Sequence, residues 1–356
     1  MKKVLILVNH DVVIYNFRKE LVQQLLKDDY KVYISSPYGM RIDYLIDMGC
    51  EYIETEIDRH GMSIFKDYKL ISKYKKLIKK IKPNIVLSYT IKPNLYGGIA
   101  CRILNIPYIA TITGLGTAIE KKGLLHRLLI YFYRFSFKNI NAVFFQNKSN
   151  QQFFYRSKIA VDRHKLVSGS GVNLEEFPFE KYPETRDTIK ILFIGRIMKE
   201  KGIEELTKAA SIIKNKRQDI EFDAIGFYEK DYEAKAKEIE KLNIIKFHGV
   251  QENVKQFIRE TNVVILPSYH EGMANVLLEA SAMGRPIIAS SIPGCEEIFD
   301  EGLTGLGVNP GNVDSIVSAI QEFIDLPHEE KEKMGYLARK KIEREFDRNK
   351  VVSAYI

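Results

Sequence analysis

The stretch SYHEGMANVLLEASAMGRP (268–286) contains two glutamates eight positions apart, Glu271 in a loop-like segment and Glu279 in an apolar, helix-like run. An ionised carboxylate accepts several hydrogen bonds, so each glutamate suits a pair of neighbouring sugar hydroxyls. We expect Glu279 to bind a nucleoside ribose and Glu271 to bind a second sugar. Spacing alone is weak support, since glutamates eight positions apart usually have no shared function.

Between these glutamates the sequence predicts the start of a helix. The apolar spacing begins near Asn275, whose side chain is a suitable N-cap. Free N–H groups at a helix N-terminus bind anions, and Gly272 lets the backbone approach closely. The backbone at Met273, Ala274 and Asn275 is therefore expected to hold a phosphate beside the two carboxylates.

A second segment, FIGRIMKEKG (193–202), supplies cations. Arg196 follows Gly195 after a strand-like run, and Lys201 precedes the next helix-like run. Both cations would lie at the carboxyl end of a strand, where they can neutralise a diphosphate without a metal ion. A solvated basic loop is the alternative for this segment alone. Together with the glutamate pair, the diphosphate site becomes the better interpretation.

Strand-like and helix-like segments alternate along the chain in two series, as in parallel β-α-β units. The expected strands lie at 3–9, 31–35, 85–90 and 107–113, and then at 190–196, 220–226, 243–249, 262–268 and 286–290. The expected helices lie at 16–28, 40–48 and 97–105, and then at 202–215, 230–241 and 251–260. The fold class is therefore α/β, with Rossmann-like domains at 1–173 and 189–356 joined by a polar linker at 174–188.

The sequence argues against several other kinds of site and segment. Neither series has a GxGxxG fingerprint after its first strand, which argues against NAD or FAD, and P-loop and Asp-x-Asp patterns are missing. Cys50, Cys101 and Cys295 have neither zinc-site spacing nor a disulfide pattern, so a reducing cytosol is expected. The N-terminal apolar run is too short for a signal peptide, and no stretch reaches the roughly 18 apolar residues of a membrane span.

Positive charge is concentrated in the first half of the chain. Residues 1–178 contain 28 Lys and Arg against 15 Asp and Glu, a net charge of +13, within a whole-chain charge of +8. Residues 179–356 contain 26 against 31, a net charge of −5. The first half therefore suits an anionic partner, with an ordinary lysine-rich composition as the alternative.

The motifs together resemble a known family. HEGMANVLLEASAMGRPIIAS (270–290) is similar to the E-x7-E signature of retaining family 4 glycosyltransferases, and FIGRIMKEKG resembles the arginine–lysine diphosphate clamp of that family. SGSGVNLEEF (168–177) resembles the segment that closes the family's first domain. YNFRKELVQQL (15–25) and SYTIKPNLYGG (88–98) look like segments of bacterial capsule, O-antigen and lipid-linked oligosaccharide transferases. The similarity covers nearly the whole chain.

This resemblance implies a GT-B fold, in which two Rossmann-like domains face each other across a cleft and the second holds a nucleotide sugar, usually a UDP-sugar. It implies a hexosyltransferase that retains the anomeric configuration, without a metal ion or other cofactor. The leaving phosphate of such enzymes is thought to take the proton of the acceptor. The residues singled out above would bind the donor, with Glu271 at the sugar and with Val250 and Val254 near the base. N-acetylgalactosamine is the first donor sugar to test.

The first domain departs from the family pattern. Many members have two glycines after the first strand, where this chain has NHDVVIYNF (9–17), and a histidine where this chain has TITGLGT (111–117). Glycines in the second loop are expected to allow close backbone approach instead. The candidate residues of the first domain for the acceptor are His10, Asp11, Lys92, Asn94, Gly114 and Gly116.

Two basic segments bear on the acceptor. Residues 66–82 contain eight lysines and one aspartate, and residues 121–138 mix basic residues with Leu, Tyr and Phe. Such helices can lie on an anionic membrane, whereas a solvated helix face and core packing are the respective alternatives. We expect a cytoplasmic protein docked on the inner leaflet, with an undecaprenyl-diphosphate-linked saccharide as acceptor. No nucleic-acid module is recognised, so nucleic acid is not an expected partner.

Two alternatives remain open from the sequence. A non-hydrolysing UDP-sugar 2-epimerase has the same two-domain architecture but needs no acceptor. A non-catalytic module that binds a sugar nucleotide would lack turnover altogether. The E-x7-E segment favours the transferase.

Overall fold

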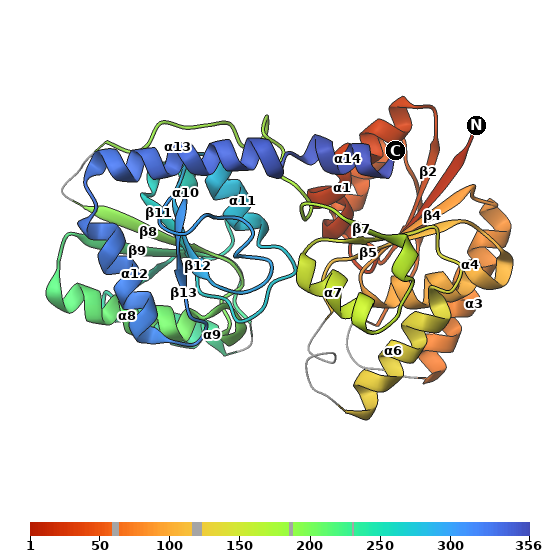
Figure 1. The fold of residues 1–356 in the computed structure, drawn as a ribbon, viewed down its shortest axis with the longest axis horizontal. Helices are drawn as coiled ribbons and strands as arrows, with labels where there is room; N and C mark the ends of the chain where they lie inside the picture. The colour runs from red at the N-terminus through yellow and green to blue at the C-terminus, as the bar shows by residue number, and fades with distance from the viewer. Residues whose placement is uncertain (59–63, 116–122, 185–187, 230) are drawn as a thin grey trace. The chain divides into compact units, whose positions relative to one another are not determined.

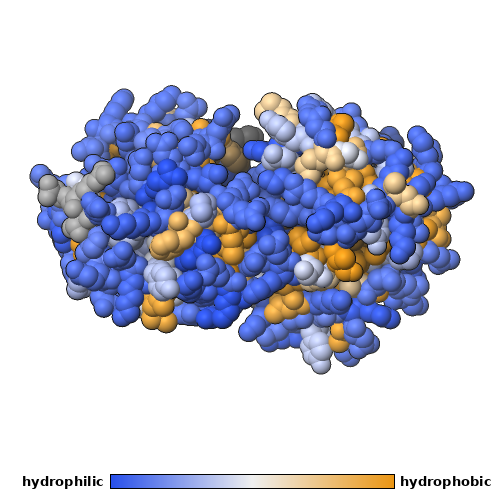
Figure 2. Space-filling model, turned by 90° about the horizontal axis from the view of Figure 1, so that it is seen from above, coloured by the Kyte–Doolittle hydropathy of each residue, from blue (hydrophilic) through white to orange (hydrophobic). Residues whose placement is uncertain are grey.

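The computed structural model describes residues 1–58, 64–115, 123–184, 188–229 and 231–356 (Figure 1). These residues form two compact units, Met1–Ser170 with Asn349–Ile356, and Gly171–Arg348. Within the described residues, no helix is long and apolar enough to span a bilayer. On the face seen in Figure 2 hydrophilic residues predominate, and apolar residues form separate patches.

The first unit is built on a parallel sheet of seven strands in the order β3-β2-β1-β4-β5-β6-β7. The strands are β1 (Lys3–Leu7), β2 (Lys31–Ser36), β3 (Glu51–Glu54), β4 (Ile85–Tyr89), β5 (Tyr108–Ile112), β6 (Ala142–Phe145) and β7 (His164–Leu166). The strand order reverses between β1 and β4, which is the position where open α/β sheets bind ligands at the carboxyl ends of their strands.

Helices cover both faces of this sheet. They are α1 (Asp11–Lys27), α2 (Arg41–Asp47), α3 (Ile64–Ile81), a π-helical turn η1 (Pro93–Gly97), α4 (Gly98–Leu104), α6 (Leu124–Ser136), α7 (Lys148–Arg156) and α14 (Arg348–Tyr355). Alternate residues of β1 point to opposite faces. Val4 and Ile6 pack in one core with Ile14 of α1, whereas Leu5 and Leu7 pack in the other with the helices α3, α4 and α6. This alternation explains why the strands are apolar throughout.

The second unit repeats the architecture with six parallel strands in the order β10-β9-β8-β11-β12-β13. The strands are β8 (Ile189–Ile194), β9 (Ile220–Ile225), β10 (Lys246–Phe247), β11 (Val263–Leu266), β12 (Ile287–Ser290) and β13 (Gly305–Val308). The helices are η3 (Lys199–Lys201, 3-10), α8 (Ile203–Lys216), α9 (Tyr232–Lys241), α10 (Val254–Glu260), α11 (Asn275–Ala282), α12 (Val313–Asp325) and α13 (His328–Glu345). The α/β class with two parallel-sheet, Rossmann-like units is therefore confirmed.

The unit boundaries differ from those expected. Residues 349–356 belong to the first unit, because the ring of Tyr355 stacks on that of Phe144 with centroids 4.4 Å apart. The described residues of the expected linker at 174–188, namely 174–184 and 188, belong to the second unit. Its backbone is held there by Arg285, a fully buried residue whose guanidinium donates to the carbonyls of Glu180 and Lys181, both at 3.0 Å.

Several expected elements have different ends. Helix α1 begins at Asp11 rather than at 16, because His10 caps it with its side chain. Strand β10 has two residues, Lys246–Phe247, instead of the seven expected at 243–249. The expected helix at 97–105 is preceded by the π-helical turn η1, which begins at Pro93.

Candidate donor-binding site

The loop between β11 and α11 places Glu271 beside a cation. Lys201 Nζ donates to Glu271 Oε1 at 2.5 Å, and Ser268 Oγ donates to the same oxygen at 2.8 Å. The side chain of Lys201 is 18% exposed and that of Glu271 is 10% exposed. Both side chains lie at the carboxyl ends of neighbouring strands, since η3 follows β8 and the Glu271 loop follows β11. The sequence predicted this edge of the sheet for both residues.

Two glycines, Gly202 and Gly294, allow the backbone around the Glu271 loop to pack closely. Gly202 has a φ of +74°, and a Cβ at this position would lie 2.1 Å from the carbonyl oxygen of Pro267. Gly294 has a φ of +88°, and its Cβ would lie 2.7 Å from the carbonyl oxygen of Glu271. Both positions need glycine for backbone conformation and for space. The Glu271 loop is thus held between the turn that precedes α8 and the turn at Gly294.

Helix α11 begins where it was expected, but its N-terminus differs in detail. Its N-cap is Ala274, with no side-chain hydrogen bond, so the expectation that Asn275 is the cap was wrong. The N–H of Ala274 donates to the carbonyl of Gly294 at 2.8 Å and is therefore not free for a phosphate. The N–H groups of Asn275 and Val276, in the first turn of the helix, have no intrahelical acceptor. The expected phosphate site therefore has one hydrogen-bond donor fewer, the N–H of Ala274.

Glu279 lies in the second turn of α11 and is only partly accessible. Burial raises the pKa of Glu279 to about 7, and the positive charge of Arg348 partly opposes this shift. The carboxylate accepts no hydrogen bond from any residue that the structure describes. It is thus available to the hydroxyls of a ligand, but ionising it near neutral pH costs free energy.

Arg196 is placed in the loop after β8, as expected, and it has an acidic partner. Its Nη1 donates to Glu229 Oε1 at 3.1 Å, and the Arg196 side chain is 47% exposed. Gly195 approaches the next loop closely, because a Cβ on Gly226 would lie 1.8 Å from the Gly195 carbonyl oxygen. The structure therefore joins Lys201 with Glu271 and pairs Arg196 with Glu229.

The residues expected near the base lie after β10. Val250 is exposed in this loop, and Val254 is the first residue of α10. The loop is anchored by His248, whose Nε2 lies 2.6 Å from Asp223 Oδ1 and whose carbonyl accepts from Gln251 Nε2 at 2.6 Å. The loop after β10 is therefore fixed to strand β9 through Asp223, and it lies next to the loops that carry Arg196 and Glu229.

In the first unit, His10 and Asp11 lie at the carboxyl end of β1. His10 Nδ1 accepts from the Val12 N–H at 3.2 Å and contacts the Asp11 carboxylate. Asp11 is buried and accepts from the Arg41 N–H at 3.2 Å. A Cβ on Gly39 would lie 2.2 Å from Asp11 Oδ2, so the loop before α2 closes over this carboxylate. Asp11 is thus held by backbone, and the half-exposed His10 is the more accessible of the two.

The other first-unit candidates are mostly engaged. Lys92 Nζ lies 3.2 Å from Asp67 Oδ1, and Asn94 Nδ2 donates to the Thr111 carbonyl at 2.9 Å. Asn94 Oδ1 is buried and has no partner among the described residues. A Cβ on Gly114 would meet no atom of the described residues within 4 Å. Gly116 lies outside the described residues.

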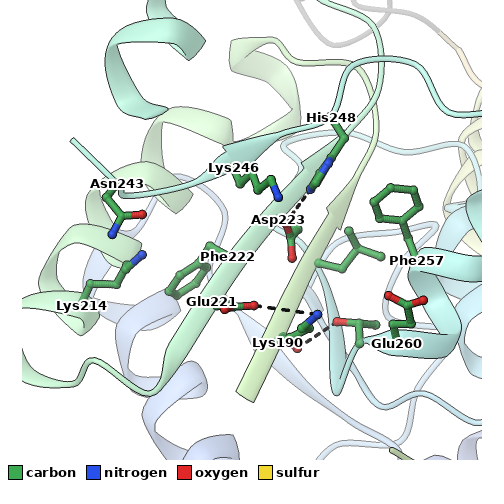
Figure 3. Close-up of a pocket in the computed structure, with 12 residues that line it drawn as sticks. Lys190, Lys214, Glu221, Phe222, Asp223, Asn243, Lys246, His248, Phe257 and Glu260 are labelled. Atoms are coloured by element: carbon green, nitrogen blue, oxygen red, sulfur yellow. Dashed lines mark hydrogen bonds and ion pairs between the residues drawn. The ribbon is translucent and has the colours of Figure 1, made fainter. Parts of the chain in front are cut away.

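A cavity of about 300 Å³ lies elsewhere in the second unit, over the face of β8 and β9 beside α10 (Figure 3). Lys190, Glu221 and Asp223 line it together with Phe257 and His248. None of the expected donor residues lines it, and Lys190 stands at the amino end of β8, away from Arg196. Since parallel sheets bind ligands at the carboxyl ends of their strands, we do not assign the donor to this cavity.

Comparison with protein families covers both units. The model of glycosyl transferases group 1 matches residues 175–341, and the model of glycosyl transferase 4-like proteins matches residues 3–147. The chain therefore belongs to the glycosyltransferases that these two family models describe. The donor-site motifs described above all fall within the group 1 match.

Curated relatives of this glycosyltransferase include bacterial enzymes named for a lipid-linked acceptor and for capsular polysaccharide synthesis. An N,N'-diacetylbacillosaminyl-diphospho-undecaprenol alpha-1,3-N-acetylgalactosaminyltransferase of Campylobacter jejuni is 24% identical over 88% of this chain and 86% of its own length. A capsular polysaccharide biosynthesis glycosyltransferase of Staphylococcus aureus is 28% identical over 81% of this chain and 79% of its own length.

Solved structures agree in fold. The Anabaena protein Alr3699/HepE, crystallised with UDP and glucose, has a TM-score of 0.81 at 15% identity, covering 100% of this chain and 98% of its own. A glycosyltransferase of Rickettsia africae has a TM-score of 0.79 at 18% identity, covering 99% of this chain and 96% of its own. The glycosyltransferase thus has the GT-B fold.

Three contacts of this glycosyltransferase were missed by sequence reasoning. Ser268 stands at the end of the expected strand 262–268, so its position next to the loop was a usable signal for its bond to Glu271. Tyr269 donates its hydroxyl to Glu205 Oε1 at 2.9 Å, across 64 residues of sequence. Gly294 contacts the loop from a distant segment, and no local pattern indicates either of these long-range contacts.

Proposed function

We propose that this glycosyltransferase moves a hexosyl or N-acetylhexosaminyl group from a UDP-sugar to a saccharide linked to undecaprenyl diphosphate, with retention of the anomeric configuration. The observation that carries the proposal is the arrangement of Lys201, Glu271 and the start of α11 at one edge of the second sheet. A cation and free helix N–H groups suit the diphosphate, and the carboxylate suits the sugar hydroxyls.

The charges of this site fit the proposed reaction. When the bond between the anomeric carbon and the diphosphate oxygen breaks, negative charge develops on the leaving diphosphate and positive charge on the sugar ring. Lys201, Arg196 and the N–H groups at the start of α11 stabilise the leaving group. Glu271 orients the sugar and offsets part of the ring charge. The acceptor oxygen bonds the anomeric carbon on the face that the diphosphate leaves, and its proton passes to the departing phosphate oxygen.

The donor is proposed to be a UDP-sugar, with Glu279 on the ribose diol and with Val250 and Val254 near the uracil. Support comes from the related folds crystallised with UDP, such as Anabaena Alr3699/HepE. Retention is supported by two relatives named as alpha-1,3-transferases, because the common UDP-hexoses are themselves α-anomers.

Metal independence is part of the proposal. Arg196 and Lys201 supply two positive charges to the diphosphate when the donor displaces their carboxylate partners, Glu229 and Glu271, and these charges take the place of a divalent counter-ion. Rates measured in EDTA should equal those in Mg²⁺ or Mn²⁺. Turnover that appears only with an added divalent ion would refute this part of the proposal.

The proposed acceptor is a lipid-linked saccharide, and the protein is proposed to act at the inner face of the membrane. The Campylobacter relative is named for a diphospho-undecaprenol acceptor, and an Escherichia coli relative is named for GlcNAc-diphosphoundecaprenol. The net charge of +13 in residues 1–178 suits both a diphosphate-bearing acceptor and an anionic membrane surface.

The decisive test offers the purified protein several UDP-sugars with and without a short-chain, diphosphate-linked acceptor. A transferase gives an acceptor-dependent glycosylated product whose new linkage has the α configuration by NMR. A 2-epimerase would convert the donor without any acceptor, and a binding module would bind UDP-sugar without turnover. Either of those results would refute the proposed transfer.

A further inference from the structure

Helices α3, α4 and α6 form one layer over one face of the first sheet (Figure 1). Their inward side chains share a single core, in which Tyr74 of α3, Ile99 of α4 and Tyr133 of α6 are buried. Helices α4 and α6 are joined by Arg102, whose guanidinium carbon lies 4.1 Å from the centre of the Phe135 ring. The outward side chains of the three helices therefore belong to a common surface.

This surface exposes large apolar and aromatic groups. They are Phe65 and Tyr68 on α3, Ile103 on α4, and Leu128, Tyr131 and Phe135 on α6. Phe65 is 84% exposed and Tyr131 is 64% exposed. The three groups on α6 are spaced by three and four residues, which places them on one side of the helix. A single exposed apolar residue means little, but six on one helical layer need a reason.

The same surface is strongly basic. Its exposed cations on α3 are Lys66, Lys69, Lys73, Lys76, Lys79 and Lys80, and those on α6 are Arg127 and Arg134. The only carboxylate within these three helices is Asp67, which is buried and bound to Lys92. Lys66 is paired with Asp58, which precedes α3, at 2.7 Å. Otherwise the outward side combines aromatic groups with positive charge that no carboxylate of the three helices offsets.

We propose that this aromatic–basic face, defined by the six apolar groups and eight cations named above, docks on an anionic lipid bilayer. The lysines and arginines are attracted to the lipid phosphates, and the aromatic rings enter the headgroup region. The proposal rests on the proposed function in one respect, namely that the acceptor resides in the membrane. It adds the surface through which the enzyme reaches that acceptor.

The composition favours a bilayer over other occupants of this face. A protein partner or a second copy of the chain would bury the aromatic groups, but six lysines on one helix oppose such desolvation, and lysine is depleted in protein interfaces. Lysine side chains can keep their ammonium groups among lipid headgroups while their stems cover apolar surface. Charge complementarity therefore points to a lipid surface.

The test is flotation of the full-length protein with vesicles of phosphatidylcholine alone and of phosphatidylcholine with phosphatidylglycerol, at low and high salt. Binding is expected to need the anionic lipid and to weaken with salt. The variant Lys73→Glu/Lys76→Glu should lower the affinity by about 25-fold or more, since each cation contributes about fivefold. The variant Leu128→Ser/Tyr131→Ser should lower it by about tenfold, because inserted apolar surface is lost.

The matched control is Lys241→Glu/Leu242→Ser in the second unit, which changes one exposed cation and one group that is 72% exposed. It should bind vesicles like the wild type. All four changed positions of the two test variants are exposed, so folding should be preserved, as circular dichroism and the thermal midpoint can verify. Wild-type vesicle binding by both test variants would overturn the proposal. The proposal would also be overturned if the wild type proved to be a dimer and either variant a monomer, since the face would then be a self-association surface.

Activity measurements separate this proposal from the proposed function. With a short-chain, water-soluble acceptor, both test variants should turn over at the wild-type rate, whereas with an acceptor embedded in vesicles their rates should fall with binding. Vesicle binding without any transferase activity would support the face and refute the function. Transfer to the soluble acceptor with no binding to anionic vesicles would support the proposed function and refute the docking face.

Discussion

Lys201 and Glu271 form an ion pair at the carboxyl edge of the second sheet, in which their charges neutralise each other. Lys201 Nζ lies 2.5 Å from Glu271 Oε1, although the proposed function assigns Lys201 to the diphosphate and Glu271 to the sugar. The donor therefore has to share or replace this ion pair when it binds. Because both side chains are largely screened from water, the exchange of partners has a substantial effect on affinity.

Replacing Glu271 by Gln tests this exchange. The ammonium of Lys201 would face the diphosphate without a competing carboxylate, so UDP alone should bind as tightly as before or up to about tenfold more tightly, a change of about 1.4 kcal/mol. Transfer should fall by about 100-fold or more, because the group that orients the sugar is lost. Isothermal titration with UDP and product assays with UDP-sugar measure the two effects.

Lys201→Met is the matched partner variant. It removes the cation while keeping much of the side-chain length, and it should weaken UDP binding and transfer together. If Glu271→Gln weakened UDP binding as much as Lys201→Met, the carboxylate would be needed for the diphosphate itself, and the assignment of Glu271 to the sugar would be wrong.

The carboxyl of Glu279 predicts a pH dependence of donor binding. Burial raises the pKa of Glu279 to about 7, and the proposed ribose contact needs the ionised form to accept two hydrogen bonds. Binding of UDP-sugar should therefore weaken by about tenfold from pH 8 to pH 6. Titrations should use an intact UDP-sugar, whose diphosphate does not titrate in this range. Glu279→Gln should bind more weakly and without this pH dependence, and an unchanged profile in that variant would exclude Glu279 as the source.

The same pKa shift predicts the opposite trend for the stability of the ligand-free protein. A carboxyl whose pKa is raised on folding favours the protonated folded state. Its contribution to stability is fully present below the ordinary glutamate pKa and is lost as pH rises through about 7. Glu279→Gln should remove this loss, so its thermal midpoint relative to wild type should rise between pH 5 and pH 8. A constant difference between the two proteins over that range would contradict the shift.

Gly202 tests how the cation is placed. A Cβ at Gly202 would lie 2.1 Å from the backbone oxygen of Pro267, in addition to the cost of a φ of +74°. Gly202→Ala should destabilise the second unit by about 3 kcal/mol or more and reduce transfer, because Lys201 is the preceding residue. Gly302→Ala is the matched control, since Gly302 has a φ of +70° and open space around its Cβ, and it should cost only about 1 kcal/mol. Equal losses in denaturant unfolding would mean that the approach to Pro267 is not what requires glycine.

Much of this architecture could be predicted from local patterns. The strand-helix alternation predicted nine of the thirteen strands that the structure describes, because a parallel strand buried on both faces is a short apolar run, whereas β3, β6, β7 and β13 were not predicted. The two motifs were expected at the carboxyl ends of strands, and the structure brings Lys201 and Glu271 into contact there. The start of α11 at Asn275 was also expected, from the core-facing spacing of Val276, Leu277, Ala280 and Met283.

What the sequence could not provide depends on contacts between distant segments. The carbonyl of Gly294 accepts a hydrogen bond from the N–H of Ala274, so this N–H is not available to a phosphate. Gly294 lies 20 residues after Ala274 in the sequence. Arg285 fastens residues 180–181 to the second unit, so a stretch with the composition of a linker is packed. Tyr355 belongs to the first unit because of its stacking on Phe144, and neither residue shows this in its local sequence.

Tyr269 and Glu205 provide a prediction about how the Glu271 loop is held. The Tyr269 hydroxyl donates to Glu205 Oε1 at 2.9 Å, and the Tyr269 N–H donates to the Glu200 carbonyl at 2.9 Å, so the loop is tied to η3 and to the first turn of α8. Burial and the neighbouring carboxylate raise the pKa of Tyr269 above its usual value, which keeps its hydroxyl protonated as a donor. The other carboxylate oxygen, Glu205 Oε2, is buried without a partner among the described residues.

Tyr269→Phe should therefore leave the Glu205 carboxylate without its hydroxyl partner, destabilise the second unit by about 1–3 kcal/mol, and loosen the loop that carries Glu271. We expect kcat to fall by about tenfold while the affinity for UDP changes little, because the diphosphate ligands lie outside this loop or at its far end. Glu205→Gln keeps an acceptor for the Tyr269 hydroxyl and should retain most of the wild-type kcat. If the negative charge of Glu205 were what supports kcat, this variant would lose activity as well. A Tyr269→Phe variant with full kcat at reduced stability would show that the contact supports the fold without positioning Glu271.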